Sequence, residues 1–171
     1  MNRKLLAAAT ALMVFGPAMS ACAGERPAGS PKPEMTVLEH YSKAPFAAVP
    51  SLPECTRMTG MRGNPAEEPS TLMVQMDGGC AATTHWHTAN EEMLLLQGAI
   101  KAQIVGQPEV DVRAGAYILL PARSHHRFRC VSEEACILFL VADRPFDVHN
   151  VGEHGKEISA EEAIRAAGRA R

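Results

Sequence analysis

The sequence predicts an all-β domain built as an antiparallel sandwich or barrel. From residue 55 to residue 151, apolar residues occur either in short continuous runs or in alternation with polar residues, as in strands that bury both faces or one. Gly, Pro and Asp separate these short stretches, which is typical of all-β folds. About 150 residues follow the predicted leader, enough for one domain with a hydrophobic core but not for two.

The first 21 residues are predicted to be a secretory signal peptide and not part of the fold. A basic start at Arg3 and Lys4 precedes an apolar run that is too short to span a bilayer, and small residues follow it. The four residues M-S-A-C that end at Cys22 resemble a bacterial lipobox, in which the cysteine is lipidated. Ordinary cleavage after Ala23 is the alternative. Both alternatives predict export to the periplasm or envelope.

Residues 22–48 are predicted to form a flexible tether, because their first part is rich in Pro, Gly, Ser and charge and lacks apolar periodicity. A membrane contact is expected only through a lipid on Cys22. Of 17 basic residues, Arg3 and Lys4 leave with the leader, so 15 basic and 19 acidic residues give a mature net charge of −4. No basic stripe is present, so no nucleic-acid partner is expected.

The cysteine count favours two disulfides in an oxidising compartment. If Cys22 is lipidated, four of the five cysteines remain, and an even set suits an exported protein. Cys130 and Cys136 flank a plausible hairpin tip and can pair across neighbouring strands, which leaves Cys55 for Cys80. Free buried thiols are the alternative. The cysteines are not expected to bind zinc, because no Cys-x₂-Cys spacing occurs.

Several strands are predicted along the domain, each bounded by turn signals. The runs at residues 116–120 and 135–141 are continuously apolar, so we interpret them as buried strands. The other predicted strands cover residues 70–76, 92–97, 100–104 and 110–112. Residues 152–171 differ in character: Ser159 followed by Glu162 is a capping-box pattern before an Ala-rich stretch. We expect a short C-terminal helix there, with a solvated tail as the alternative.

The stretch from residue 79 to residue 98 carries the candidate site. His85 and His87 are two residues apart, so on a strand both imidazoles point to one side. Glu91 lies beyond a short polar turn, and its carboxylate can join them if the chain doubles back there. Two histidines and a carboxylate on one side of an ion form the ligand set of many non-haem iron sites. A histidine pair without a metal is the alternative.

This stretch resembles the first motif of the cupin family, G-x₅-H-x-H-x₃₋₄-E-x₆-G, at every fixed position. Glu92 would satisfy the longer spacing but then falls one residue short of Gly98. Strand parity also favours Glu91, which shares a face with Met93 and Leu95. Trp86, between the two histidines, is expected to face away from the metal and pack against a neighbouring strand.

Residues 115–130 resemble the second cupin motif at Gly115, Pro121 and His126. They depart from it at Arg123, where the family usually has Gly, and at Cys130, where it usually has Asn. The first departure concerns a turn, because Gly tolerates backbone angles that Arg does not.

Alternation separates His126 from its neighbour His125. His126 shares a face with Phe128, which is typical of an inner face, whereas His125 shares the other face with Arg127 and Arg129. His126 is therefore the predicted ligand, and His125 is predicted to be a rim or surface residue.

The resemblance implies a cupin-type double-stranded antiparallel β-barrel, jelly-roll-like, over residues 49–151. It also implies one divalent metal ion (Fe, Mn, Ni, Cu or Zn) held by His85, His87, Glu91 and His126, with up to two positions free for water, substrate or dioxygen. Cupins often pair through sheet edges, so a homodimer is expected from the resemblance alone.

Two functions of different classes are consistent with these residues. The first is a secreted or lipid-anchored metalloenzyme, dioxygenase-like, that acts on a small organic molecule. The second is a non-catalytic cupin of the cell envelope that binds a small ligand. The predicted inward residues around the site are apolar, which suits an apolar substrate but offers no proton shuttle. Tyr117 and His125 are the rim candidates for that task.

Overall fold

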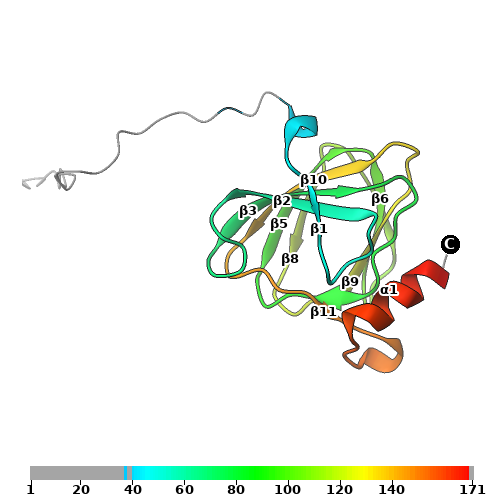
Figure 1. The fold of residues 1–171 in the computed structure, drawn as a ribbon. Helices are drawn as coiled ribbons and strands as arrows, with labels where there is room; N and C mark the ends of the chain where they lie inside the picture. Colours follow the sequence, from blue (N-terminus) through cyan, green and yellow to red (C-terminus); the bar gives the residue numbers. More distant parts are fainter. Residues whose placement is uncertain (1–36, 38–39, 170–171) are drawn as a thin grey trace, which may run out of the picture. The chain divides into compact units, whose positions relative to one another are not determined.

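Two antiparallel sheets enclose the hydrophobic core of the domain (Figure 1). The computed structural model describes Val37 and residues 40–169. The expected signal peptide (residues 1–21), Cys22 and most of the expected tether (residues 22–48) lie outside the described residues. Within the described part of the chain, no helix is long and apolar enough to cross a membrane.

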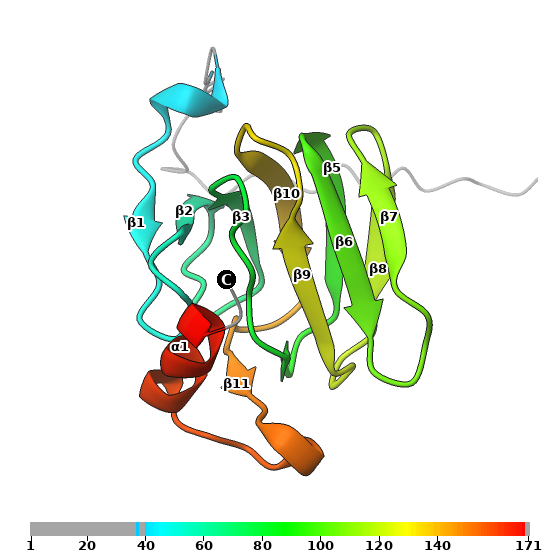
Figure 2. The ribbon, with the colours of Figure 1, turned by 90° about the vertical axis from the view of Figure 1, so that its right-hand side faces the viewer.

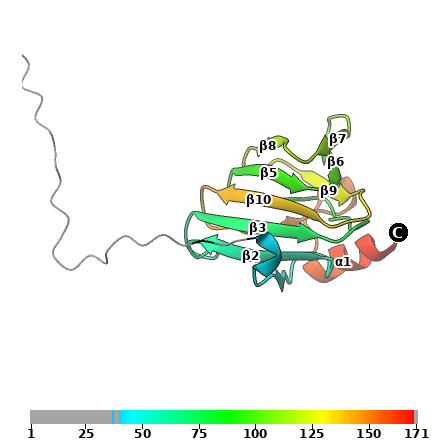
Figure 3. The ribbon, with the colours of Figure 1, turned by 90° about the horizontal axis from the view of Figure 1, so that it is seen from above.

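The larger sheet has six strands in the order β1-β2-β3-β10-β5-β8, and every neighbouring pair is antiparallel. Figure 3 shows β2, β3, β10, β5 and β8 side by side in this order. The strands are β1 (Ala47–Ala48), β2 (Thr56–Arg62), β3 (Ser70–Met76), β10 (Cys136–Ala142), β5 (Glu91–Gln97) and β8 (Tyr117–Leu120).

The smaller sheet has five strands in the order β11-β4-β9-β6-β7, again antiparallel throughout. Figure 2 shows β9, β6 and β7 next to one another in this sheet. The strands are β11 (His149–Asn150), β4 (His85–Trp86), β9 (His126–Cys130), β6 (Ala99–Ile104) and β7 (Val110–Arg113).

Among the described residues, three short helices accompany the sheets: η1 (Tyr41–Lys43), η2 (Glu153–Gly155) and α1 (Ala160–Arg169). The capping box predicted for α1 is present. Ser159 Oγ accepts from the backbone N–H of Glu162 at 3.2 Å, and the Glu162 carboxylate accepts from the N–H of Ser159 at 3.0 Å. α1 lies near β11 in both Figure 1 and Figure 2.

The predicted fold class, an all-β double-stranded barrel with a short C-terminal helix, is confirmed. The tether prediction needs a correction at its end. Ala47 and Ala48 form β1 and pair with Met58 and Arg57 of β2, so the sheet begins before residue 49. β2 itself was not among the predicted strands, because its sequence T-R-M-T-G-M-R lacks a clean apolar alternation. Its pairing with β3 holds it extended.

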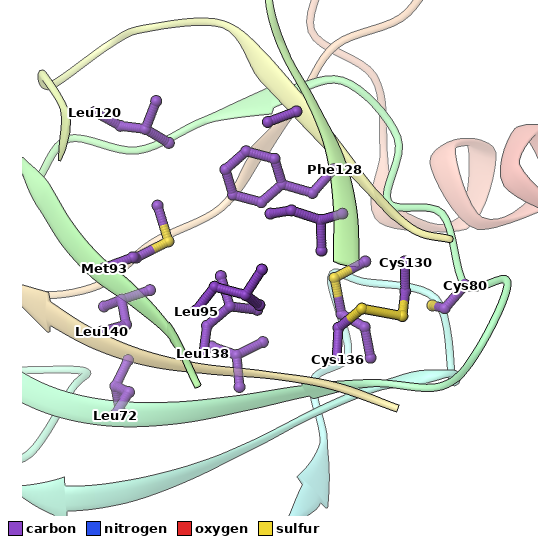
Figure 4. Close-up of a cluster of buried hydrophobic side chains, with 14 of the residues drawn as sticks. Leu72, Cys80, Met93, Leu95, Leu120, Phe128, Cys130, Cys136, Leu138 and Leu140 are labelled. Atoms are coloured by element: carbon purple, nitrogen blue, oxygen red, sulfur yellow. A yellow bond between two sulfur atoms is a disulfide. The ribbon is translucent and has the colours of Figure 1, made fainter. Parts of the chain in front are cut away.

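The core lies between the inward faces of the two sheets (Figure 4). β5 shows the expected alternation, with Met93 and Leu95 buried and Leu94 and Leu96 exposed. Alternation of this kind follows from the two-residue period of a strand. The side chains labelled in Figure 4 include Leu72, Met93, Leu95, Leu120, Phe128, Leu138 and Leu140.

Two disulfides are present among the described residues, and their pairing fits the one favoured by the sequence. Cys55 is bonded to Cys80, and Cys130 is bonded to Cys136. The second bond joins the end of β9 to the start of β10 and therefore links the two sheets. Cys80, Cys130 and Cys136 are fully buried.

Candidate metal centre

The five-stranded sheet places two histidines side by side. β4 and β9 pair so that His85 lies opposite His126, and directly opposite residues of a sheet project to the same face. Their ring centroids are 4.4 Å apart, and both side chains are buried. The alternation of β9 turns His126 and Phe128 inward and Arg127 and Arg129 outward, as the sequence predicted.

His87 and Glu91 approach the same point from the chain beyond β4. The nitrogens that His85, His87 and His126 offer to an ion lie within 4.8 Å of one another. Glu91 Oε2 lies 3.3 Å from His87 Nε2 and 3.8 Å from His126 Nε2. Glu91 is only 3% exposed, whereas Glu92 points outward. The structure thus brings His85, His87 and His126 together as one group and places Glu91 beside two of them.

Backbone carbonyls fix the tautomer of all three imidazoles. His85 and His126 each donate from Nδ1 to the carbonyl two residues earlier, at 2.7 and 2.8 Å. His87 donates from Nδ1 to the carbonyl of Asp147. Because a carbonyl oxygen only accepts, Nδ1 carries the proton, and Nε2 keeps its lone pair for a metal. Oriented histidines of this kind are typical of metal sites.

Burial keeps the cluster uncharged in the absence of an ion. It lowers the pKa of His87 to about 3, an effect that nearby His85 reinforces and the hydrogen bond to Asp147 opposes. Burial likewise lowers the pKa of His85 and brings that of His126 well below its usual range. Burial raises the pKa of the Glu91 carboxyl to about 8. In all four groups, burial disfavours the charged form because that form loses its hydration.

The donor set fits a divalent metal ion. Glu91 Oε2 is buried without a hydrogen-bond partner among the described residues, and a buried polar atom normally has one. A cation beside three neutral imidazole nitrogens would supply that partner and favour the ionised carboxylate. Nitrogen and oxygen donors of this type suit Fe, Mn, Ni, Cu or Zn.

A small cavity lies beside the imidazoles inside the barrel. Its volume is about 50 Å³, and its lining includes the four candidate ligands together with apolar side chains such as Met58, Met93, Phe128 and Phe146. This is room for one or two water-sized molecules. Flexible methionine side chains allow the wall to adapt to a larger guest.

The rim candidates Tyr117 and His125 do not line this cavity. Tyr117 is exposed on the outer face of the larger sheet and donates to the Glu92 carboxylate at 3.1 Å. His125 lies parallel to the Trp86 ring, with 6.4 Å between centroids. Neither residue is therefore placed to transfer a proton at the metal.

Trp86 faces away from the ligands, as the alternation of β4 requires, and packs in a stack on the outside of the sheet. Its ring is parallel to that of His149 on the neighbouring strand β11, with centroids 3.8 Å apart. The guanidinium carbon of Arg123 lies 4.9 Å from its centroid, within range of a cation–π contact. The stack fixes Trp86, the residue between the two histidine ligands.

Arg123 adopts the backbone conformation that the motif position normally gives to glycine. Its φ is +62°, in the left-handed region that side chains other than glycine seldom occupy. Its N–H donates to the carbonyl of His87 at 2.8 Å. The turn is therefore retained despite the substitution, and its backbone supports the segment that follows the second histidine.

The loop after β10 carries functional residues that the sequence analysis missed. Asp147 offers its carbonyl to His87, and its carboxylate accepts from the N–H and hydroxyl of Thr88 at 2.8 and 2.7 Å. Phe146 stacks on the His87 ring, with centroids 4.7 Å apart. A backbone carbonyl has no sequence signature, so only the charge of Asp147 and the aromatic Phe146 could have hinted at this role.

Comparison with known proteins identifies the fold family. No curated protein sequence matches the chain, but residues 72–142 match the family model of the cupin domain. The polyketide cyclase RemF of Streptomyces resistomycificus is 21% identical with a TM-score of 0.56, covering 69% of this chain and 87% of that one.

Two further solved structures share the fold at low identity. An RmlC-like cupin of Shewanella frigidimarina is 14% identical with a TM-score of 0.51, covering 65% of this chain and 92% of that one. The oxalate decarboxylase of Lactobacillus farciminis is 18% identical with a TM-score of 0.52, covering 65% of this chain and 34% of that one. Sequence motifs, sheet order and family match agree: the barrel of this chain is a domain of the cupin superfamily.

Proposed function

We propose that this protein is an exported metalloenzyme of the cupin superfamily, dioxygenase-like, that acts on a small organic molecule. The observation that carries this proposal is the cluster of three imidazoles, each with its Nε2 free for an ion. The buried Glu91 Oε2 lies beside two of them and has no hydrogen-bond partner in the described residues. The likeness to a polyketide cyclase and an oxalate decarboxylase concerns the fold alone at these identities, so the proposal rests on the site.

His85, His87 and His126 would hold the metal, with Glu91 as the fourth ligand. Bound there, a redox-active ion supplies Lewis-acid or oxygen-activating chemistry. The protein's own part is orientation and exclusion of water. The three carbonyl-anchored imidazoles are pre-oriented, and the apolar cavity wall of Met93, Phe128 and Phe146 selects a small apolar or aromatic substrate.

Export is supported by two independent features. The leader at residues 1–21 has the organisation of a signal peptide. The two disulfides suit an oxidising compartment. We propose the periplasm or envelope as location, with lipid anchoring through Cys22 as the variant that membrane fractionation of a Cys22→Ala protein would test.

The proposed reaction is tested by turnover. The protein is purified without chelators and loaded in parallel with Fe(II), Mn(II), Ni(II), Cu(II) or Zn(II). Oxygen uptake and product masses are then followed with a panel of small aromatic and aliphatic substrates. We expect uptake with one redox-active metal and its loss in His87→Ala. The control variant His125→Ala, whose ring lies outside the cavity, should retain it. Absence of turnover with every metal and substrate would contradict the proposal.

A second candidate, a non-catalytic ligand-binding cupin, is favoured by one observation. Apart from the four candidate ligands, the only polar side chain lining the described cavity is Thr56, whose hydroxyl lies 3.4 Å from Cys80 Sγ. The site therefore has no separate acid or base. Mass spectrometry of the native protein distinguishes the candidates, because a small ligand that copurifies and survives incubation with oxygen unchanged would support binding.

A further inference from the structure

A second hollow lies outside the barrel, between the outer face of the five-stranded sheet and the C-terminal segment. Its volume is about 650 Å³, within the range of small-molecule sites. The segment 81–84 and the outward residues of β9 line one side, and residues 151–153, Ile158 and α1 line the other. We call this hollow the outer groove. Its lining shares only Ala82 and Phe128 with the cavity inside the barrel.

Two arginines of β9 line the outer groove. Arg127 and Arg129 are exposed and share the outward face of the strand, so their Cα atoms are about 7 Å apart. In the part of the chain that the structure describes, no ion pair or hydrogen bond joins either guanidinium to another residue. The N–H donors of both guanidinium groups are therefore available to a ligand in the groove.

The neighbouring charges leave this pair uncompensated. Lys101 lies directly opposite Arg129 on β6, an arrangement that like charges disfavour. Lys101 is itself satisfied by Glu109 and Asp111, at 3.2 Å each. Two acidic residues, Glu109 and Glu153, also line the groove. Glu109 is paired with Lys101, and Glu153 lies on the segment opposite β9 without a bond to either arginine among the described residues. The sheet side of the groove is therefore positive.

Apart from Glu153, the wall of the groove opposite β9 is apolar. Val151, Ile158, Ala166 and Ala167 line it, and the alanines of α1 leave space where larger side chains would fill the groove. An apolar surface that faces two unpaired guanidiniums matches a ligand with one anionic end and one apolar end. A purely charged ligand would leave the alanine wall unused, and a purely apolar ligand would bury the arginines without a partner.

We propose that the outer groove binds an amphipathic organic anion, with its carboxylate or phosphate on Arg127 and Arg129 and its apolar part against Ile158 and α1. The interior imidazoles are not part of this lining, so the groove is a site distinct from the metal centre and does not depend on its function. The anion can be a soluble molecule or the head of an anionic lipid, since both offer the same chemistry.

Equilibrium dialysis of the full-length protein with three probes tests the proposal. Decanoate carries both features, decanol lacks the charge, and acetate lacks the apolar chain. We expect decanoate to bind at least tenfold more tightly than either, and more weakly at high salt because the contact is exposed. Equal binding of decanol and decanoate would overturn the assignment to the arginines, and equal binding of acetate would overturn the apolar wall.

Variants locate the site. Arg127→Gln combined with Arg129→Gln should weaken decanoate binding at least tenfold, and Ala166→Leu should weaken it by filling the groove. Arg62→Gln, which removes an exposed arginine of β2 outside the groove, is the matched control and should bind as the wild type does. All are exposed positions, and unchanged melting temperatures exclude unfolding as the cause. Undiminished binding by the double arginine variant would contradict the proposal.

Sedimentation with phosphatidylglycerol vesicles, beside phosphatidylcholine vesicles, separates the two sources of the anion. It uses protein with Cys22→Ala to remove any lipid anchor. Binding to phosphatidylglycerol vesicles that is lost in the double arginine variant would place the anion in a membrane. Binding of decanoate without vesicle binding would place it in solution. If neither decanoate nor the anionic vesicles bind, the proposal is wrong.

Discussion

At the scale of single residues, the candidate centre holds a carboxyl group where its charge is unfavourable. Glu91 is buried beside neutral histidines, and its Oε2 has no hydrogen-bond partner in the described residues. Removing such a group from water raises its pKa, and a positive ion beside it has the opposite effect. The metal-free protein should therefore carry a measurable stability cost at Glu91.

Glu91 makes the metal-free protein less stable as the pH rises. Its pKa is about 8 in the folded state against an ordinary value of 4.5, so the folded state binds more protons between these values. The free energy of unfolding therefore falls as the pH rises above 4.5. The stability that the protonated carboxyl contributes is lost as the pH rises through 8. The histidines act in the opposite direction but only below 6.5, because their pKa values are lowered.

Urea denaturation with a chelator between pH 6.5 and 8 isolates this effect. We expect the wild type to lose about 1.5 kcal/mol across this window, and Glu91→Gln to lose none, because an amide does not titrate. Equal pH slopes in the two proteins would show that Glu91 is not the responsible group.

The left-handed backbone conformation of Arg123 can be tested by substitution. Arg123→Gly and Arg123→Ala both remove the guanidinium from Trp86, but only glycine accepts a φ of +62° without a steric penalty. The glycine variant should be the more stable of the two by about 1 kcal/mol, measured by thermal or chemical denaturation. If the alanine variant is equally stable, the left-handed turn is not under strain.

At the scale of elements, the loop from Asp143 to Asp147 connects the end of β10 to the metal centre. Its two aspartates hold Thr88 and Asn90 in the segment that follows His87. Asp147 accepts from Thr88, and Asp143 accepts from the N–H and side-chain amide of Asn90 at 2.8 and 2.6 Å. Only Asp147 also contacts a candidate ligand, through the carbonyl that orients His87.

These two aspartates form a matched pair of variants. Asp147→Ala keeps the carbonyl that accepts from His87 but removes the carboxylate bonds to Thr88 that hold this residue in place. It should therefore lower metal affinity by about tenfold, the size of effect expected when a histidine ligand loses its orientation. Asp143→Ala removes a similar number of hydrogen bonds and should change affinity by less than about threefold, with a comparable loss of stability of about 1–2 kcal/mol. Competition with a chromophoric chelator measures both. Equal losses of affinity would assign Asp147 a structural role only.

The sequence predicts those elements whose pattern is local. Strands β3, β5, β6, β7, β8 and β10 follow from apolar runs or alternation, and the helix follows from the Ser159–Glu162 capping box. β1, β4 and β11 are two residues long, too short for any periodicity to be recognised. They exist because neighbouring strands offer them hydrogen bonds, which is a property of the assembled sheet.

The same distinction applies to the candidate site. The four ligands were predictable because their spacing and face are set by strand geometry and by the motif they form. The carbonyl of Asp147 and the stacking of Phe146 on His87 were not, since a loop about 60 residues away in sequence delivers them. The outer groove likewise depends on where α1 packs, although the exposure of Arg127 and Arg129 follows from alternation alone.

At the scale of the whole domain, one disulfide and the candidate metal centre lie at opposite ends of the barrel. β9 begins with His126 and ends with Cys130, and β10 begins with Cys136 beside the end of β5. The disulfide that links the sheets therefore lies at the end of the barrel opposite the four ligands. Cross-links restrict the unfolded chain, so they stabilise the scaffold without occupying the site.

The central claim is that His126, and not its neighbour His125, joins His85, His87 and Glu91 around one metal ion. Elemental analysis of protein purified without chelators or affinity metal tests it most directly, with His126→Ala and His125→Ala prepared in parallel. We expect close to one metal ion per chain in the wild type and in His125→Ala, and almost none in His126→Ala. Full metal content in His126→Ala, or no metal in any of the three proteins, would contradict the proposed centre.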